Sequence, residues 1–193
     1  SAFFLFGTAL LYGFAGTVEL RGISDALTAQ AGDSGLVVAG VALLMVGLLF
    51  KIGAAPFHQW TPDVYQGSPT SVTGFMAACT KVAAFGALLR VMYVALGGIR
   101  WDWRPVMYII AALTMIVGTL FALTQTDIKR MLAYSSVAQA GFMLVGVLAT
   151  SAAGLAGTMV YLLAYGIATI GAFAIVSLVR DATGEATHLD DHS

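Results

Sequence analysis

Residues 131–179 read MLAYSSVAQAGFMLVGVLATSAAGLAGTMVYLLAYGIATIGAFAIVSLV and contain no Asp, Glu, Lys, Arg or His. As one α-helix, this run would be about 73 Å long at 1.5 Å per residue, more than twice the roughly 30 Å thickness of a bilayer core. The run therefore predicts two membrane-spanning helices, joined by a turn between Thr150 and Gly154.

The whole chain has the composition of this run. Of its 193 residues, 59% are hydrophobic and only 10% are charged, which is too apolar for a soluble domain. We therefore predict an all-α, polytopic membrane protein with about six transmembrane helices, one of them discontinuous. The predicted helices cover residues 2–16, 36–55, 70–97, 105–123, 128–149 and 155–180.

The net charge and the two ends of the sequence indicate which partners the chain can have. The net charge is −1 and no basic patch is present, which argues against a nucleic-acid partner. The lipid bilayer is the expected surrounding. Because the sequence begins inside an apolar run and ends in a polar tail, we expect an internal segment of a longer polytopic protein.

Lys51 stands in an apolar run, where a lysine at mid-bilayer costs about 2.5–3.5 kcal/mol on insertion scales. Pro56 cannot donate a hydrogen bond to the carbonyl of Ile52, and Pro62 follows it closely. We therefore expect the helix 36–66 to be broken at Pro56 and Pro62, with carbonyl groups freed beside Lys51. Lys51 would then face protein or trapped water; the alternative is that its side chain reaches the membrane interface.

His58 follows the expected break by two residues and titrates near neutral pH. It is a candidate proton relay, with a hydrogen-bonded loop histidine as an equally open alternative. Broken helices that carry an ionisable group at the break recur in ion-coupled transporters. Lys51 and His58 are therefore candidate sites of proton transfer, and small residues such as Gly47 on the face of Lys51 would let another helix approach.

Lys81 lies in a second apolar run, which begins near Thr70. About eleven residues at 1.5 Å each place it near the middle of a core about 30 Å thick. Small residues at helical spacing share its face and predict close packing against other helices. These residues are Gly74, Ala77, Ala78 and Ala84. We expect Lys81 to exchange protons, because burial disfavours the charged form of a lysine; an inert, ion-paired lysine is the alternative.

A polar segment, residues 126–130, separates two later apolar runs, and Thr126 or Asp127 can cap the helix that follows. That helix contains unusual polarity for a membrane span. The residues concerned are Tyr134, Ser135, Ser136 and Gln139. They could line a hydrated path or form hydrogen bonds between helices, and both interpretations stay open.

Trp101 and Trp103, flanked by Arg100 and Arg104, are typical of an interfacial belt that anchors a helix at the level of the lipid headgroups. Arg90, near the end of the preceding helix, is expected to anchor in the same way. These residues place the boundary between two spans near residue 100.

Signatures of redox or hydrolytic chemistry are missing from the sequence. It has no Cys/His cluster for zinc or iron–sulfur, no glycine-rich phosphate loop after a strand, and no nucleophile with its base. We therefore expect no cofactor and no metal site in this chain, and no redox chemistry within it.

Three segments carry a resemblance to a known family. Residues 51–69 read KIGAAPFHQWTPDVYQGSP, residues 80–86 read TKVAAFG and residues 127–136 read DIKRMLAYSS. In this order they resemble the antiporter-like N subunits of respiratory complex I, the proton-translocating NADH:quinone oxidoreductase. The resemblance extends over nearly the whole chain.

The resemblance implies a fold of two five-helix bundles related by inversion, of which this chain would hold the sixth to eleventh of roughly fourteen helices. Residues 1–97 would be the end of the first bundle and would include the broken helix 36–66. Residues 98–180 would start the second, inverted bundle, and residues 181–193 would form a polar loop or tail.

The resemblance also implies roles for single residues. Lys51 matches the broken-helix lysine that holds a proton, Lys81 the lysine that connects two half-channels, and His58 a histidine near the break. A glutamate upstream and a lysine downstream would complete the path outside this chain. Gln139 departs from the histidine of many relatives and can orient water but not titrate near pH 7.

By resemblance, the function is proton translocation by a membrane-arm subunit of the quinone oxidoreductase, with flavin and iron–sulfur clusters in other subunits. The bacterial plasma membrane is the expected location. Two alternatives remain: a subunit of a multi-subunit sodium/proton antiporter or membrane-bound hydrogenase, and a passive structural subunit. The Tyr-Gln-Gly-Ser-Pro stretch at residues 65–69 favours the complex I subunit.

Overall fold

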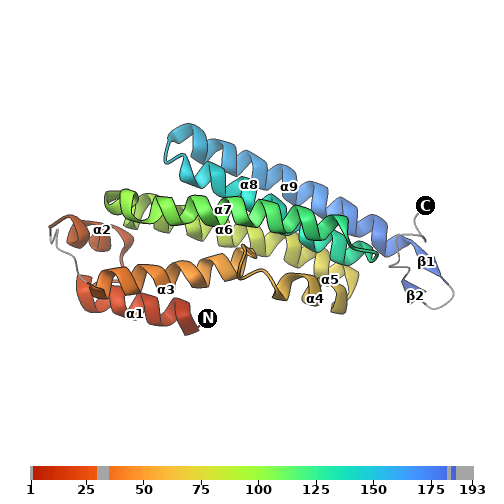
Figure 1. The fold of residues 1–193 in the computed structure, drawn as a ribbon, viewed down its shortest axis with the longest axis horizontal. Helices are drawn as coiled ribbons and strands as arrows, with labels where there is room; N and C mark the ends of the chain where they lie inside the picture. The colour runs from red at the N-terminus through yellow and green to blue at the C-terminus, as the bar shows by residue number, and fades with distance from the viewer. Residues whose placement is uncertain (1, 30–34, 182–183, 186–193) are drawn as a thin grey trace.

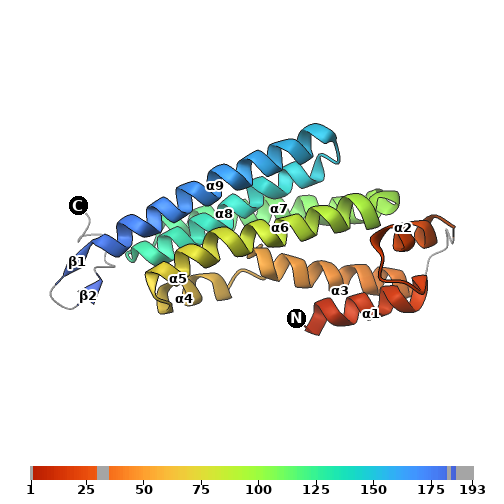
Figure 2. The same ribbon diagram turned by 180° about the vertical axis from the view of Figure 1, so that it is seen from behind.

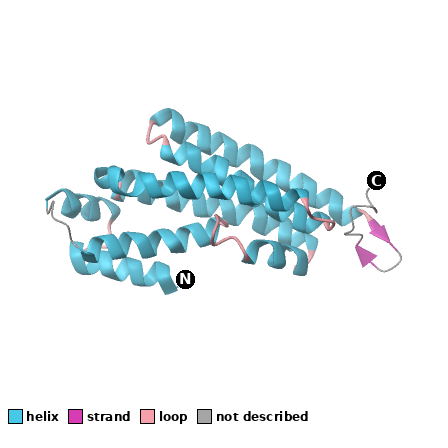
Figure 3. Cartoon of the chain, in the orientation of Figure 1, coloured by secondary structure: helices cyan, strands magenta, loops and turns pink. Residues whose placement is uncertain are grey.

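The computed structural model describes residues 2–29, 35–181 and 184–185, and nearly all of these lie in helices (Figure 3). The α-helices are α1 (Ala2–Ala15), α2 (Leu20–Ala29), α3 (Gly35–Ile52), α4 (Trp60–Gly67), α5 (Thr70–Phe75), α6 (Lys81–Arg90), α7 (Arg100–Leu123), α8 (Ile128–Leu148) and α9 (Ala152–Leu178). Two π-helical segments, η1 (Met76–Thr80) and η2 (Val91–Ala95), and a 3₁₀ turn, η3 (Gly97–Ile99), complete the helical elements. The predicted all-α membrane class is confirmed.

Within the described residues, five helical stretches are long and apolar enough to cross a membrane. They are Gly35–Ile52, Thr70–Ala95, Gly97–Leu123, Ile128–Leu148 and Ala152–Leu178. The helix at the first predicted span, α1, is too short to be one of these five stretches. It passes the same test of length and composition only together with α2, and the two helices are bent by 54° relative to each other. The sequence did not predict α2, because its alternating polar and apolar residues do not resemble a membrane span.

The predicted helix 105–123 begins five residues earlier, at Arg100, and contains Pro105. Pro105 is the sixth residue of α7, just beyond the first N–H groups that have no partner within the helix, so it removes one hydrogen bond, to the carbonyl of Trp101. At the start of α8, Asp127 is the cap, since its Oδ1 accepts a hydrogen bond of 2.9 Å from the backbone N–H of Arg130.

The long helices run roughly along one axis of the molecule (Figures 1 and 2). Helix α8 packs against both α7 and α9, and α9 also packs against the continuous stretch formed by α5, η1 and α6. Helix α3 packs against α1, on the side of the molecule away from α9. Helix α2 lies next to η2 and η3, at the end of the molecule where α7 begins. The short helix α4 packs against α8, which brings the segment after the helix break beside the start of the second half of the chain.

Glycines set the closest helix contacts. A Cβ atom on Gly7 would lie 2.5 Å from the backbone nitrogen of Leu44, where α1 meets α3. A Cβ atom on Gly118 would lie 2.4 Å from the backbone nitrogen of Ala138, where α7 meets α8. Small residues therefore let these helices approach backbone to backbone, as is typical of membrane bundles.

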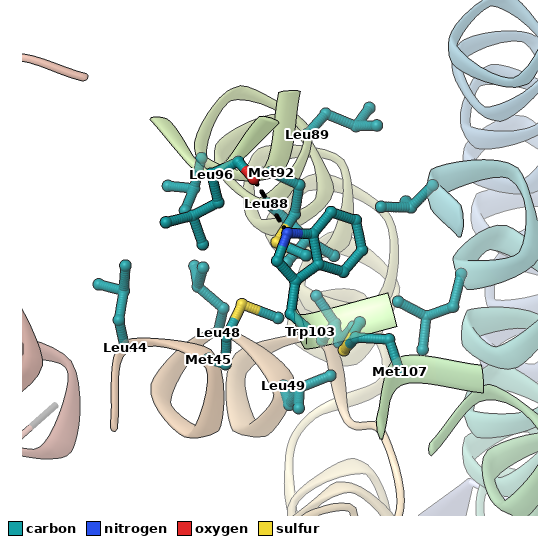
Figure 4. Close-up of a cluster of buried hydrophobic side chains, with 14 of the residues drawn as sticks. Leu44, Met45, Leu48, Leu49, Leu88, Leu89, Met92, Leu96, Trp103 and Met107 are labelled. Carbon is teal, nitrogen blue, oxygen red and sulfur yellow. Dashed lines mark hydrogen bonds between the residues drawn. The ribbon is translucent and has the colours of Figure 1, made fainter. Parts of the chain in front are cut away.

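An apolar cluster joins α3, the α6–η2 stretch and α7 (Figure 4). Trp103 lies within it, only 6% exposed, and its indole nitrogen donates a 3.0 Å hydrogen bond to the carbonyl of Leu96. The prediction of an interfacial belt is therefore wrong for Trp103, whose polar atom finds a partner inside the protein. Trp101 is 71% exposed, and its place at the membrane interface stays a prediction.

The predicted discontinuity follows α3 and is made by a glycine as well as a proline. Gly53 has a φ of +75°, and hydrogen bonds from Gly53 to Phe50 and from Ala54 to Leu49 close the end of the helix. This is the pairing of a helix that ends at a left-handed glycine. The chain then passes Pro56, with a cis Ala55–Pro56 bond, before α4 begins.

Pro62 does not act as the sequence predicted. It is the third residue of α4 and lies in its first turn, where a missing N–H breaks no helical hydrogen bond. The discontinuity therefore lies between Ile52 and Trp60, with Pro56 inside it.

The end of the described chain forms a small antiparallel pair of two-residue strands, β1 (Arg180–Asp181) and β2 (Gly184–Glu185), with Arg180 opposite Glu185. The expected polar loop or tail, residues 181–193, begins with this hairpin. Residues 182–183 and 186–193 of that prediction lie outside the described residues.

Candidate functional site

Lys81 is the first residue of α6, directly after the π-helical segment η1, and is 5% exposed. The predicted strip of small residues packs against α9: a Cβ on Gly74 would lie 3.1 Å from the Cβ of Phe173, and one on Gly166 would lie 4.0 Å from that of Ala78. Close packing on this face therefore encloses the lysine. Its predicted burial between helices is confirmed.

The Lys81 ammonium is held by neutral oxygen atoms and an aromatic ring. Nζ donates to the backbone carbonyl and to the Oγ of Ser136, both at 2.5 Å, and lies 5.2 Å from the ring centroid of Tyr165. The Tyr165 hydroxyl donates to the same Ser136 Oγ at 2.7 Å. In the described part of the chain Lys81 forms no ion pair, and the alternative of an ion-paired structural lysine is not tested.

Three tyrosines around this lysine were missed by the sequence analysis. Tyr65 of α4 is 3% exposed, packs edge-on against Phe173 and interacts with Ser136 and Tyr165. Further along α9, the Tyr161 hydroxyl donates a hydrogen bond to Gln139 of α8. Tyr161 and Tyr165 are one turn apart in an otherwise apolar helix, and this spacing was the available signal.

The four polar residues predicted in α8 separate into two groups. Ser136 and Gln139 face α9 through their hydrogen bonds with Tyr165 and Tyr161. Tyr134 instead lies against other rings, 6.2 Å from His58 and 5.5 Å from Phe121 between centroids. Ser135 is half-buried. Ser136 therefore belongs to the lysine site, whereas Tyr134 belongs to the helix break.

His58 lies in the break itself and is half-buried. Its Nδ1 atom is buried and has no hydrogen-bond partner in the described part of the chain. A buried ring nitrogen without a partner is costly, because it has lost its water. The contact with Tyr134 places His58 beside α8. Helix α8 also supplies Ser136, the partner of Lys81.

The two lysines have different surroundings. Lys51, at the end of α3, is exposed on the described chain, whereas the sequence analysis expected it to face protein or water within the membrane. One turn earlier, Gly47 is covered by Phe4, since a Cβ there would lie 2.7 Å from the Phe4 Cβ. Helix α1 therefore covers α3 up to Gly47, whereas Phe50 and Lys51 of the next turn are exposed on the described chain.

A polar cluster ties the segment after the break to the start of α8. The Arg130 guanidinium donates to Asp63 Oδ1 at 2.8 Å and to Gln66 Oε1 at 3.0 Å, both on α4. It also bonds Gln125 at 3.1 Å, and Gln66 donates to Asp127 at 3.4 Å. The same helix α4 carries Tyr65, so this cluster fixes Tyr65 relative to Ser136.

The break is also tied to α7. The backbone N–H of Ala55 donates to the hydroxyl of Thr114 at 3.0 Å, and this buried hydroxyl donates to the carbonyl of Ile110 at 2.6 Å. A hydroxyl that bonds on both sides satisfies a backbone group that the missing helix turn would otherwise leave unpaired.

Lys81 does not line the cavity of about 830 Å³ that lies between α3 and α7. This cavity is lined mainly by apolar side chains, such as Met45, Val106 and Ile110. Among residues 2–29, 35–181 and 184–185, no group of three or more His, Cys, Asp or Glu side chains could hold a metal ion.

Proton transfer is the chemistry that this arrangement can perform. An amine can release and accept a proton, and the hydroxyls of Ser136 and Tyr165 can both donate and accept hydrogen bonds. The contacts join Lys81 of α6, Ser136 of α8 and Tyr165 of α9, with Tyr65 of α4 beside them. The site is therefore assembled from four helices that are separate in sequence.

Residues 1–192 match the family described as NADH:quinone oxidoreductase/Mrp antiporter, TM. The chain is 67% identical to NADH-quinone oxidoreductase subunit N of Rhodococcus opacus over 98% of its own length, and 66% identical to that of Mycobacterium tuberculosis over 96%. In both cases it covers 35% of the relative, so the chain spans about a third of the length of these curated relatives.

Solved structures give the same relationship. The fold matches a chain of respiratory complex I from Thermus thermophilus with bound aureothin, with a TM-score of 0.76 and 44% identity, over 92% of this chain and 37% of that one. It also matches a chain of the Mrp complex from Dietzia, with a TM-score of 0.81 and 27% identity, over 89% of this chain and 31% of that one. The chain belongs to the NADH:quinone oxidoreductase/Mrp antiporter transmembrane family.

Proposed function

We propose that this chain is the central part of an antiporter-like subunit N of a proton-translocating NADH:quinone oxidoreductase, and that Lys81 carries the translocated proton. The identity of 67% to a relative with that name supports the assignment of the subunit. The observation that carries the proposed site is the burial of Lys81 against Ser136 and Tyr165, with no carboxylate of residues 2–29, 35–181 and 184–185 paired to it.

The physical reason is that two opposing effects act on the charged form of Lys81. Burial penalises the charged lysine, while two acceptors on Ser136 and the face of Tyr165 stabilise it. The ammonium is thus penalised by burial and stabilised by its contacts, so a change in a neighbouring charge can move the proton. A carboxylate at contact distance would instead hold the proton in place.

Lys51 and His58 remain proposed members of the same path. Lys51 would hold a proton opposite a carboxylate supplied by another part of the full-length protein. His58 and Tyr134 would connect the break to α8, and the Tyr161–Gln139 contact would extend the polar residues along α9. Within this proposal, residues 1–97 end one inverted bundle and residues 98–180 begin the other.

Other subunits of the complex would supply the energy for proton transfer. Redox chemistry with flavin and iron–sulfur clusters would reside in other subunits, and this chain would move protons in the bacterial plasma membrane. The partners are then further membrane-arm subunits and the lipid bilayer.

Replacing Lys81 by alanine in the full-length subunit tests the proposed site. The variant complex should assemble, but membrane vesicles should pump fewer protons per NADH oxidised. Lys81→Arg should behave in the same way, because arginine does not release its proton. Normal proton-to-electron stoichiometry in an assembled Lys81→Ala complex would refute the role of this lysine.

The second candidate function is a subunit of a multi-subunit sodium/proton antiporter, favoured by the structural match to the Mrp complex. It predicts a sodium-dependent pH gradient in vesicles that receive no NADH. The passive structural subunit makes a third prediction, that neutralising both lysines impairs assembly and leaves coupling unchanged in the complexes that form.

A further inference from the structure

Two arginines and two aromatic residues form a continuous stripe at the start of α7, which we name the α7 stripe: Arg100, Trp101, Arg104 and Tyr108. The guanidinium carbons of Arg100 and Arg104 lie 5.7 and 5.5 Å from the centroid of the Trp101 ring. Arg104 also lies 5.7 Å from the Tyr108 ring centroid and donates to the Tyr108 hydroxyl at 3.0 Å. Both positive charges are therefore held beside one indole.

The two charges of the α7 stripe are not neutralised within the described part of the chain. Neither Arg100 nor Arg104 forms an ion pair there. The Nε atom of Arg104 is buried and has no hydrogen-bond acceptor among the described residues. Asp102 lies in the same helical turn but lines the cavity between α3 and α7. Two adjacent cations with a donor left over favour an anion.

The position of the α7 stripe in the membrane indicates where this anion comes from. The stripe begins at the fourth residue of the candidate span Gly97–Leu123, and near the end of a span arginine and tryptophan commonly meet lipid headgroups. Beyond it, α7 carries a row of exposed apolar side chains along the rest of the span. These side chains are Ile109, Leu113, Ile116 and Leu120.

We propose that the α7 stripe binds the phosphate group of an anionic phospholipid, whose acyl chains lie along the exposed apolar row of α7. Guanidinium groups present paired N–H donors that match phosphate oxygens, and Trp101 and Tyr108 pack beside the glycerol region. A zwitterionic phospholipid carries a compensating cation next to its phosphate and is attracted less strongly.

Photolabelling of the assembled complex, with the full-length subunit, tests this site. Two photoreactive phospholipids with identical acyl chains, one with a glycerol and one with a choline headgroup, are reconstituted with the complex, and labelled peptides are identified by mass spectrometry. The peptide that contains residues 101–109 should be labelled preferentially by the anionic lipid. Each arginine replaced by glutamine should lower that preference by about fivefold.

The matched control is Arg21→Gln, which removes an exposed arginine of α2 at the same end of the molecule and should leave the labelling of α7 unchanged. Arg104→Lys keeps the charge but not the paired donors and should retain part of the preference. Inorganic phosphate in excess should not compete, because it lacks acyl chains.

Several results would overturn the proposal. They are equal labelling by the two lipids, a preference that survives in the Arg100→Gln/Arg104→Gln variant, competition by free phosphate, and an unlabelled stripe covered by another protein segment. The comparison of the two lipids on the unmodified complex decides the question even when the double variant does not accumulate.

Discussion

Substitution of Gly118 by alanine should destabilise the contact between α7 and α8 and displace the acceptors of Lys81. The new Cβ would lie 2.4 Å from the nitrogen, 2.7 Å from the Cα and 2.9 Å from the Cβ of Ala138. None of these atoms can rotate away. Since carbon atoms pack at about 3.5–4.0 Å, the two helices must separate by about 1 Å.

The cost follows from this overlap. Overpacking of one methyl group in a close contact costs about 1–3 kcal/mol. Gly157 is the matched control, because a Cβ there meets no atom within 4 Å, and its replacement by alanine should stabilise α9 by about 0.5–1 kcal/mol. The two alanine variants should therefore differ by about 1.5–4 kcal/mol in unfolding free energy.

The functional consequence arises because Ser136 is two residues before Ala138 on α8. Residues two apart lie on nearly opposite sides of a helix, so a shift of α8 by about 1 Å away from α7 would press Ser136 toward Lys81. The contacts between Lys81 and Ser136 are already 2.5 Å long and cannot shorten further, so they would have to rearrange. SDS titration of the purified full-length protein measures stability, and protons pumped per NADH oxidised by the assembled complex measure function. Equal stability and equal pumping of Gly118→Ala and Gly157→Ala would refute the reasoning.

Three further substitutions test other contacts. Tyr165→Phe removes the hydroxyl that donates to Ser136 but keeps the ring beside Lys81, so it should lower proton pumping less than Ser136→Ala does in the same vesicle assay. Gly53→Ala introduces a side chain at a φ of +75° and 2.9 Å from the Thr61 hydroxyl, and should destabilise the full-length protein by about 1–2 kcal/mol in SDS titration. Asp63→Asn removes the charge of the exposed partner of Arg130 and should cost at most about 1 kcal/mol, an effect that 1 M salt should reproduce in the unmodified protein.

Local features of the sequence were sufficient for much of the fold. An uncharged run too long for one crossing required two helices, and the observed connection, residues 149–151, overlaps the start of the predicted turn at residues 150–154. The break after α3 and the capping role of Asp127 also follow from residues close together in the chain. Helical spacing placed Lys81 on a strip of small residues, which the structure confirms as a packed face.

Other features depended on neighbours that the sequence does not place. Trp103 has the composition of an interfacial anchor, yet the carbonyl of Leu96 and the apolar surfaces of α3 and α6 bury it. Lys51 lies in as apolar a run as Lys81 does, but it is exposed on the described chain. Hydropathy measures the composition of a helix and does not say which of its faces another helix covers.

The sequence by itself determined the class of protein, the spans and the two lysines as candidates. A bilayer requires apolar runs of a certain length and makes a charge within such a run costly, and both can be read from composition. Only the tertiary structure decided what surrounds Lys81. Ser136 lies 55 residues from it in the chain, and Tyr165 lies another 29 residues beyond Ser136. Contacts at such separations are set by the packing of whole helices, which brings α4, α6, α8 and α9 together around one ammonium group.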